Sequence, residues 1–162
     1  MVERRKNRGF YRWTGLLLAF LSLLLAGLAW QARQQENRQN HIYTQLDLAM
    51  ISDSLKALSA DSPAAISLGT LTNLNARVLY GMLSATNAGA VFLEHRREWD
   101  QSHELLDPWG RPFQIQLVGA ELAQKSAGEV GVKIWSVGPN GRNEGGLGDD
   151  ISCQTVAIRL GR

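Results

Sequence analysis

An uncharged stretch of 18 residues near the N-terminus, residues 13–30 (WTGLLLAFLSLLLAGLAW), most constrains how this chain can fold. As a helix at about 1.5 Å per residue, it covers roughly 27 Å of a hydrocarbon core about 30 Å thick. A tryptophan stands at each end of the stretch, where such rings prefer the level of the lipid headgroups. We therefore predict a transmembrane helix over residues 13–30.

The charges that precede this stretch predict its orientation. Five of the first 12 residues are basic, namely Arg4, Arg5, Lys6, Arg8 and Arg12. Because such charges are retained on the cytoplasmic side, we expect residues 1–12 in the cytoplasm and the rest of the chain outside it. A cleavable secretory signal has a similar layout, with small residues at Gly27 and Ala29. We favour an uncleaved anchor because the apolar run is near the long end for a signal.

The helical pattern continues beyond the apolar stretch. Residues 31–40 (QARQQENRQN) are polar but contain no glycine or proline, and their straight-chain side chains have good helix propensity. We expect one long helix whose amphipathic part, residues 31–63, ends near the sequence Asp61-Ser62-Pro63. Apolar residues recur along it at the helical spacings of three and four, in two sets: Leu48, Ile51, Leu55 and Leu58, and Ile42, Leu46 and Met50.

Length, charge and cysteine content limit what else the chain can be. Its 162 residues allow one compact domain besides the membrane helix. The formal net charge of +2 is too small for a general nucleic-acid-binding protein. Cys153 is the only cysteine, which excludes an intramolecular disulfide and a cysteine-based zinc site.

A second helix is predicted after the long one, with Thr70 or Thr72 as its N-cap and an end in the turn cluster at residues 87–89. Residues 90–93 form a short apolar run that can be a strand, and the charged residues 94–103 are expected to be a surface connection. One face of this helix carries Leu71, Leu74, Val78 and Met82.

The remaining pattern is that of strands. Residues 107–110 (DPWG) have the aspartate, proline and glycine that a type I turn favours at its first, second and last positions. Three runs with apolar residues at every second position follow, and this is the period of half-buried strands. We predict an α+β fold in which residues 64–162 form a meander of three or four antiparallel strands packed on the long helix. The alternating residues are Phe113, Ile115 and Leu117; Val130, Val132 and Ile134; and Val156, Ile158 and Leu160.

Between the last two runs lies the glycine-rich loop (residues 138–150, GPNGRNEGGLGDD), with five glycines and the adjacent carboxylates Asp149 and Asp150. Such a loop cannot order itself by burying apolar surface, and glycine makes its backbone costly to fix. Calcium is a natural way to close it, since this cation binds carboxylate, amide and carbonyl oxygens in flexible geometry. The spacing is not that of an EF-hand loop, and a flexible, solvated hairpin loop is the alternative interpretation.

Two segments of the chain resemble the type II secretion major pseudopilin family: residues 105–115 (LLDPWGRPFQI) and residues 132–151 (VKIWSVGPNGRNEGGLGDDI). In that family a DPWG turn leads into a strand, and a later strand leads into a glycine-rich loop that carries aspartates. The resemblance implies a pilin-like subunit of the bacterial inner membrane. Its N-terminal helix packs with other copies in a short filament, and its C-terminal domain is periplasmic.

The resemblance also implies a calcium site. The family's first loop aspartate corresponds to Asn140, its preceding carbonyl donor to Val137, and its late acidic pair to Asp149 and Asp150. Asn140 departs from the family pattern. An amide oxygen coordinates calcium but brings no charge, so we expect weaker binding than with an aspartate.

The N-terminus departs from the family as well. Pseudopilins carry a Gly-Phe-Thr-Leu-x-Glu junction, which is cut after the glycine and whose glutamate takes part in assembly. Here Gly9-Phe10 is followed by Tyr11 and Arg12, and Thr14 stands where the glutamate belongs. We therefore expect the precursor to keep its N-terminus.

The expected function is structural, as a subunit of a type II secretion or type IV pilus-like assembly. The expected partners are other pseudopilin or secretion-system subunits and copies of the chain itself. The alternative is a membrane-anchored extracytoplasmic binding or scaffold domain that reuses the pilin fold without polymerising. We expect no enzyme, because His41, His95 and His103 lack paired ligand spacing and Ser136 has no basic partner in sequence reach.

Overall fold

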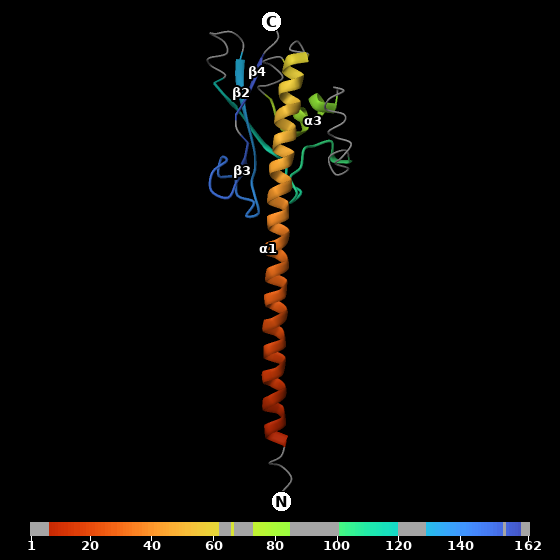
Figure 1. Ribbon diagram of the computed structural model, residues 1–162, viewed down its shortest axis with the longest axis vertical. Helices are drawn as coiled ribbons and strands as arrows, with labels where there is room; N and C mark the ends of the chain where they lie inside the picture. The colour runs from red at the N-terminus through yellow and green to blue at the C-terminus, as the bar shows by residue number, and fades with distance from the viewer. Residues whose placement is uncertain are drawn as a thin grey trace, which may run out of the picture. The chain divides into compact units, whose positions relative to one another are not determined.

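The structure, a computed structural model, describes residues 7–61, 66, 73–84, 101–119, 129–153 and 155–159. The chain divides into two compact units, Met1–Gln39 and Asn40–Arg162. One helix, α1 (Asn7–Asp61), belongs to both (Figure 1). A long apolar N-terminal helix and a small antiparallel sheet of four strands make this an α+β, pilin-like arrangement, as predicted.

In the N-terminal unit, the apolar part of α1 is exposed on all sides. Every residue from 15 to 30 is solvent-accessible, and the helix is long and apolar enough to cross a membrane. The helix also continues without a break through the polar residues 31–40. The absence of glycine and proline there explains this continuity, because straight-chain residues lose little rotamer freedom in a helix.

In the second unit, the two apolar sets of α1 separate into two faces. The inner stripe (Leu48, Ile51, Leu55 and Leu58) is buried, with at most 4% of any side chain exposed. The outer stripe contains the other predicted set together with a tyrosine, and its members are 41–57% exposed: Ile42, Tyr43, Leu46 and Met50. One helix therefore packs its own domain with one face and presents apolar side chains on another.

The sheet consists of β1 (Gln114–Val118), β2 (Glu129–Ser136), β3 (Ile151–Ser152) and β4 (Val156–Arg159). All pairings are antiparallel, and β2 pairs with each of the other three strands. The predicted meander is confirmed for β1, β2 and β4, the three runs expected to be strands, and the two-residue β3 is an addition that was not predicted. The eight-residue β2 is long enough to pair with β4 through its first half and with β3 through its last two residues.

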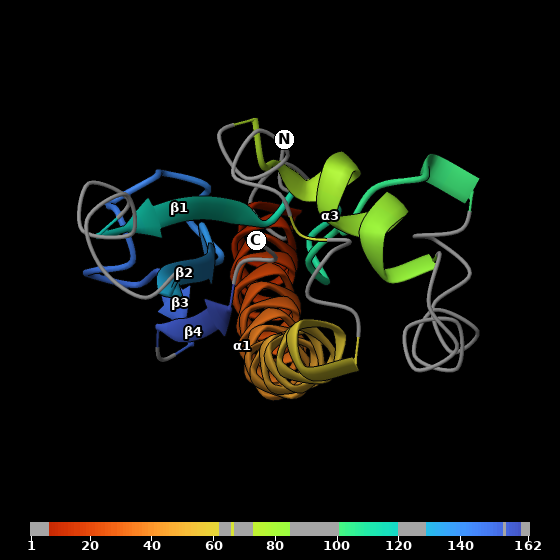
Figure 2. The same cartoon turned by 90° about the horizontal axis from the view of Figure 1, so that it is seen from above.

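The core lies between the inner stripe, the sheet and a second helix, α3 (Ala76–Ser84). From β2 it receives the alternating residues Val130, Val132 and Ile134, none of which is more than 1% exposed. Seen from above in Figure 2, the strands lie on one side of α1 and α3 lies on the other. The predicted alternation is confirmed in β2 and for Val156 and Ile158 of β4. In β1, Ile115 and Leu117 are partly buried, and Leu160 lies outside the described residues.

The second helix differs in detail from its prediction. Asn75 caps α3, since its side-chain oxygen accepts hydrogen bonds from the backbone N–H groups of Arg77 (3.1 Å) and Val78 (2.9 Å). Thr70 and Thr72, the predicted caps, lie outside the described residues, as do the predicted strand at 90–93 and most of the predicted connection at 94–103. Val78 and Met82 are only partly buried, and the buried face is Ala76, Leu79, Tyr80 and Leu83.

Candidate metal site in the glycine-rich loop

The predicted turn at residues 107–110 is present and anchors the region of the loop. Asp107 is buried, and its Oδ1 accepts hydrogen bonds from the backbone N–H groups of Trp109 (3.0 Å) and Arg111 (2.9 Å). The N–H of Gly110 donates to the Asp107 carbonyl oxygen at 2.8 Å, which closes the turn. A buried carboxylate needs such donors, so the aspartate has a structural reason to occupy this position.

The same turn holds the start of the glycine-rich loop. The Ser136 hydroxyl donates to Asp107 Oδ2 at 2.5 Å and accepts a hydrogen bond from the Gly138 N–H at 3.1 Å. Arg111 Nη1 donates to the Gly138 carbonyl oxygen at 2.5 Å. Gly141 lies against this guanidinium, and a Cβ at that position would be 2.7 Å from Arg111 Cζ. The beginning of the loop is therefore fixed by residues far back in the sequence.

Side chains of β2 hold the middle of the loop. Lys133 Nζ donates to the Gly145 carbonyl oxygen at 2.7 Å, and Trp135 Nε1 donates to Asn143 Oδ1 at 3.1 Å. The Lys133 ammonium also lies 5.5 Å from the centroid of the Trp135 ring, within cation–π range. The loop is thus ordered by polar contacts with the sheet rather than by apolar burial.

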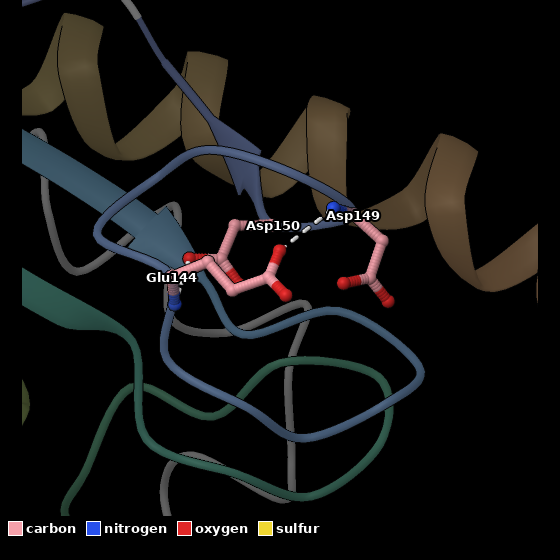
Figure 3. Close-up of side chains that lie close together, drawn as sticks. All are labelled: Glu144, Asp149 and Asp150. Atoms are coloured by element: carbon pink, nitrogen blue, oxygen red, sulfur yellow. Dashed lines mark hydrogen bonds between the residues drawn. The ribbon is translucent and has the colours of Figure 1, made fainter.

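Near its end, the loop gathers the acidic cluster (Glu144, Asp149 and Asp150). Each residue offers a carboxylate oxygen, and these oxygens lie within 4.8 Å of one another (Figure 3). Glu144 Oε2 accepts a hydrogen bond from the Asp149 N–H at 3.2 Å, drawn as a dashed line in Figure 3. Asp150 Oδ2 accepts from the N–H groups of Glu144 and Gly146, both at 2.8 Å. Three carboxylates are therefore concentrated between residues 144 and 150 of the loop.

One oxygen of this cluster is left without a partner. Among the residues that the structure describes, Asp150 Oδ1 is a buried side-chain oxygen with no hydrogen bond. A buried, unsatisfied oxygen of a charged group is costly unless another group or an ion compensates it. This oxygen is the part of the cluster that most favours a bound cation.

The structure distributes the four predicted calcium ligands differently from the family pattern. Asp149 and Asp150 both belong to the acidic cluster. Asn140 instead donates its side-chain Nδ2 to Asp149 Oδ1. The side chain of Val137 is buried directly after β2, and its role as a carbonyl donor stays a prediction. Glu144, which was not among the predicted ligands, also belongs to the cluster, and counting every carboxylate in the loop would have identified it.

The donor chemistry of the cluster fits a hard cation. Calcium binds carboxylate and carbonyl oxygens, and the loop supplies three carboxylates with one uncompensated oxygen. The amide NH₂ group of Asn140 is directed toward Asp149, and the role of Asn140 as a ligand stays a prediction. A cation at this site would be held by Glu144, Asp149 and Asp150.

The other side chains considered as reactive groups have ordinary contacts. His41 shares a hydrogen bond with Gln45, and the His103 ring packs against Tyr80 at 5.8 Å. His95 lies outside the described residues. Burial raises the pKa of the Cys153 thiol, partly offset by a backbone hydrogen bond with Ile134 and by the positive charges of Lys56 and Lys133. None of these contacts joins a base to a nucleophile, and the absence of enzyme activity stays a prediction.

In comparisons with known proteins, no family model, no curated protein and no solved structure matched this chain. The assignment to a family therefore stays a prediction that rests on the residues of the turn and of the loop.

Proposed function

We propose that this chain is a pseudopilin-like, membrane-anchored structural subunit of a type II secretion or type IV pilus-like assembly. The observation that supports this proposal best is that α1 carries one buried and one exposed apolar stripe. The inner stripe packs the external domain, and the outer stripe leaves Ile42, Tyr43, Leu46 and Met50 41–57% exposed on the same helix. Apolar side chains that continue along one face of a helix are suited to packing against another helix.

The anchor sets the geometry of that association. The apolar half of α1 is long enough to cross a bilayer, and the basic residues before it favour a cytoplasmic N-terminus. In this topology the chain is anchored in the bacterial inner membrane, and its external domain lies in the periplasm. In copies anchored in the same membrane, the outer stripe follows the membrane segment after the same number of residues, and confinement to one membrane raises the effective concentration of one stripe for another. Self-association through the outer stripe is the expected result, with related subunits as further partners.

Calcium is the cofactor proposed for the acidic cluster. Bound there, it would supply positive charge to Glu144, Asp149 and Asp150 and a partner for the buried Asp150 Oδ1. Its role is structural, because the loop lies beside β2 and is held by Lys133 and Trp135. Calcium titration followed by thermal unfolding of the full-length protein tests this part, and no shift of the midpoint at millimolar calcium would refute it.

Cysteine cross-linking in membranes tests the association. In a Cys153→Ser background, Leu46→Cys places a thiol in the outer stripe, and Gln45→Cys places one at the neighbouring exposed position on another side of the helix. Successive residues of an α-helix point about 100° apart, so the two variants differ in direction rather than in depth. We expect disulfide-linked dimers with Leu46→Cys and few with Gln45→Cys. If neither variant forms dimers, the non-polymerising binding or scaffold domain becomes the better interpretation.

A further inference from the structure

The two ends of the glycine-rich loop meet through Asn140 and Asp149. The Asn140 side-chain Nδ2 donates to Asp149 Oδ1, and its backbone N–H points at Asp149 Oδ2 at 3.4 Å. The backbone approaches closely at the same place, since a Cβ on Gly138 would collide with the Asp149 carbonyl oxygen. Gly138 also has a φ of 62°, which disfavours any other residue. The loop is therefore closed across nine residue positions at its base.

The orientation of the Asn140 amide decides what it can do there. The backbone N–H of Arg142 donates to Asn140 Oδ1 at 2.5 Å, so the amide oxygen is used inside the loop. The amide NH₂ group is thereby directed at the Asp149 carboxylate. A hydrogen bond to an ionised acceptor is stronger than one between neutral groups. An aspartate at position 140 would face Asp149 with an oxygen instead, and two carboxylates in contact need a cation or a shared proton between them.

We propose that Asn140 acts as a metal-independent clasp, in which its amide joins the two ends of the glycine-rich loop by donating to Asp149. This inference rests on the proposed function only where it concerns calcium binding at the acidic cluster. An ion bound at the acidic cluster adds to a loop whose base is already closed, and Asn140 is not one of its ligands. The clasp and the cation share Asp149 but compensate different atoms, because the uncompensated oxygen belongs to Asp150.

Amide hydrogen exchange of the full-length protein in detergent micelles tests the clasp directly. Exchange is followed in peptides covering residues 138–150, with excess chelator or with millimolar calcium, for the unchanged protein and for Asn140→Ala, Asn140→Asp and Arg142→Ala. Arg142→Ala is the matched control, since only the backbone N–H of that residue takes part in the clasp. In chelator, we expect the unchanged protein and Arg142→Ala to be equally protected. Asn140→Ala should exchange roughly tenfold faster or more, because a bond to a charged acceptor is lost.

Asn140→Asp distinguishes the clasp from a general contribution to stability. This variant should exchange as fast as Asn140→Ala in chelator and should recover its protection in calcium, since the cation can then bridge the introduced carboxylate and Asp149. Asn140→Ala should not recover fully in calcium. Protection of the loop in Asn140→Ala equal to that of the unchanged protein would overturn the clasp. Rapid exchange of the unchanged loop in chelator, reversed by calcium, would overturn it as well.

The same data separate failure of the clasp from failure of the calcium proposal. A loop that is protected in chelator, loosened by Asn140→Ala and unaffected by calcium in the unchanged protein supports the clasp and refutes the calcium site. A loop that is protected only in calcium, and whose exchange is unaffected by Asn140→Ala, supports the calcium site and refutes the clasp. Cross-linking through Leu46→Cys reports on assembly independently of both.

Discussion

The two halves of α1 show how one continuous helix can meet two different surroundings. The apolar half exposes leucines on every side, and no residue from 15 to 30 is buried within the chain. The half in the second unit buries the inner stripe completely and leaves the outer stripe exposed. The apolar half is therefore not covered by any residue that the structure describes, whereas the second half packs within its own domain. A substitution should thus have a different consequence in each half.

Truncation in the inner stripe should have the largest effect of the changes considered. Leu55→Ala removes a side chain that is 0% exposed, and filled core positions lose about 2–5 kcal/mol on such a change. Leu46→Ala, at a position 54% exposed, should change the free energy of unfolding by less than about 0.5 kcal/mol. Chemical denaturation of the full-length protein in detergent measures both. Equal losses would mean that the outer stripe is also part of the folded core.

A charge in the apolar half should act on insertion rather than on folding. Leu21→Arg places a cation near the middle of the apolar stretch, at a cost of about 2.5–3.5 kcal/mol for membrane insertion. The fraction of protein that resists alkaline extraction from membranes should fall, while the denaturation midpoint of the external domain stays unchanged. Leu21→Ala is the control for loss of the leucine. A full retention of Leu21→Arg in the membrane would argue against a spanning helix.

Two serine hydroxyl groups, one at the end of β2 and one in the apolar half of α1, also differ in their surroundings. Ser136 donates to the buried Asp107, whereas Ser22, in the apolar half, donates to the carbonyl oxygens of Leu18 and Ala19 in its own helix. Ser136→Ala leaves the Asp107 oxygen with an unmet hydrogen bond, and we expect a loss of about 1–3 kcal/mol of unfolding free energy. Ser22→Ala should be nearly neutral by the same denaturation measurement. A neutral Ser136→Ala would show that the turn does not depend on this bond.

The smallest expected effect concerns the single thiol. Burial raises the pKa of Cys153, so its thiolate fraction at a given pH is lower than that of an exposed cysteine. Alkylation of Cys153 should be slower than that of Gln45→Cys in a Cys153→Ser background, and its rate should keep rising at a higher pH. The neutral thiol makes its full contribution to the free energy of unfolding at pH values below the ordinary cysteine pKa. This contribution is lost as the pH rises through the raised pKa of Cys153. Equal alkylation profiles for both thiols would contradict this.

Much of this fold could be predicted because its elements carry periodic or positional signals. The inner stripe has helical spacing, and the turn at 107–110 has the required residues in order. β3 could not be predicted, because two residues are too few to show an alternation. The cap of α3 was placed too early because threonine and asparagine both cap helices, and the packing of Ala76, Leu79 and Leu83 decides where this helix begins.

The candidate site was less predictable than the fold. The two aspartates were identifiable from their position in the loop, and Glu144 could have been identified by its charge. The direction of the Asn140 amide could not be predicted, since it depends on the N–H of Arg142 at 2.5 Å, a contact that only the folded loop creates. The attachment of Arg111 to Gly138 joins residues 27 positions apart, for which the sequence carries no local pattern.

The position of β4 near the end of the chain has a consequence for the timing of folding. Val156 and Ile158 of β4 complete the core around the inner stripe, and Ile158 is synthesised 100 residues after Leu58 (158 − 58 = 100). At about 5–20 residues per second, roughly 5–20 s separate the two. During that interval the inner stripe lacks the part of its cover that β4 supplies. The nascent domain is therefore most in need of a chaperone or of a protecting neighbour before its last strand is made.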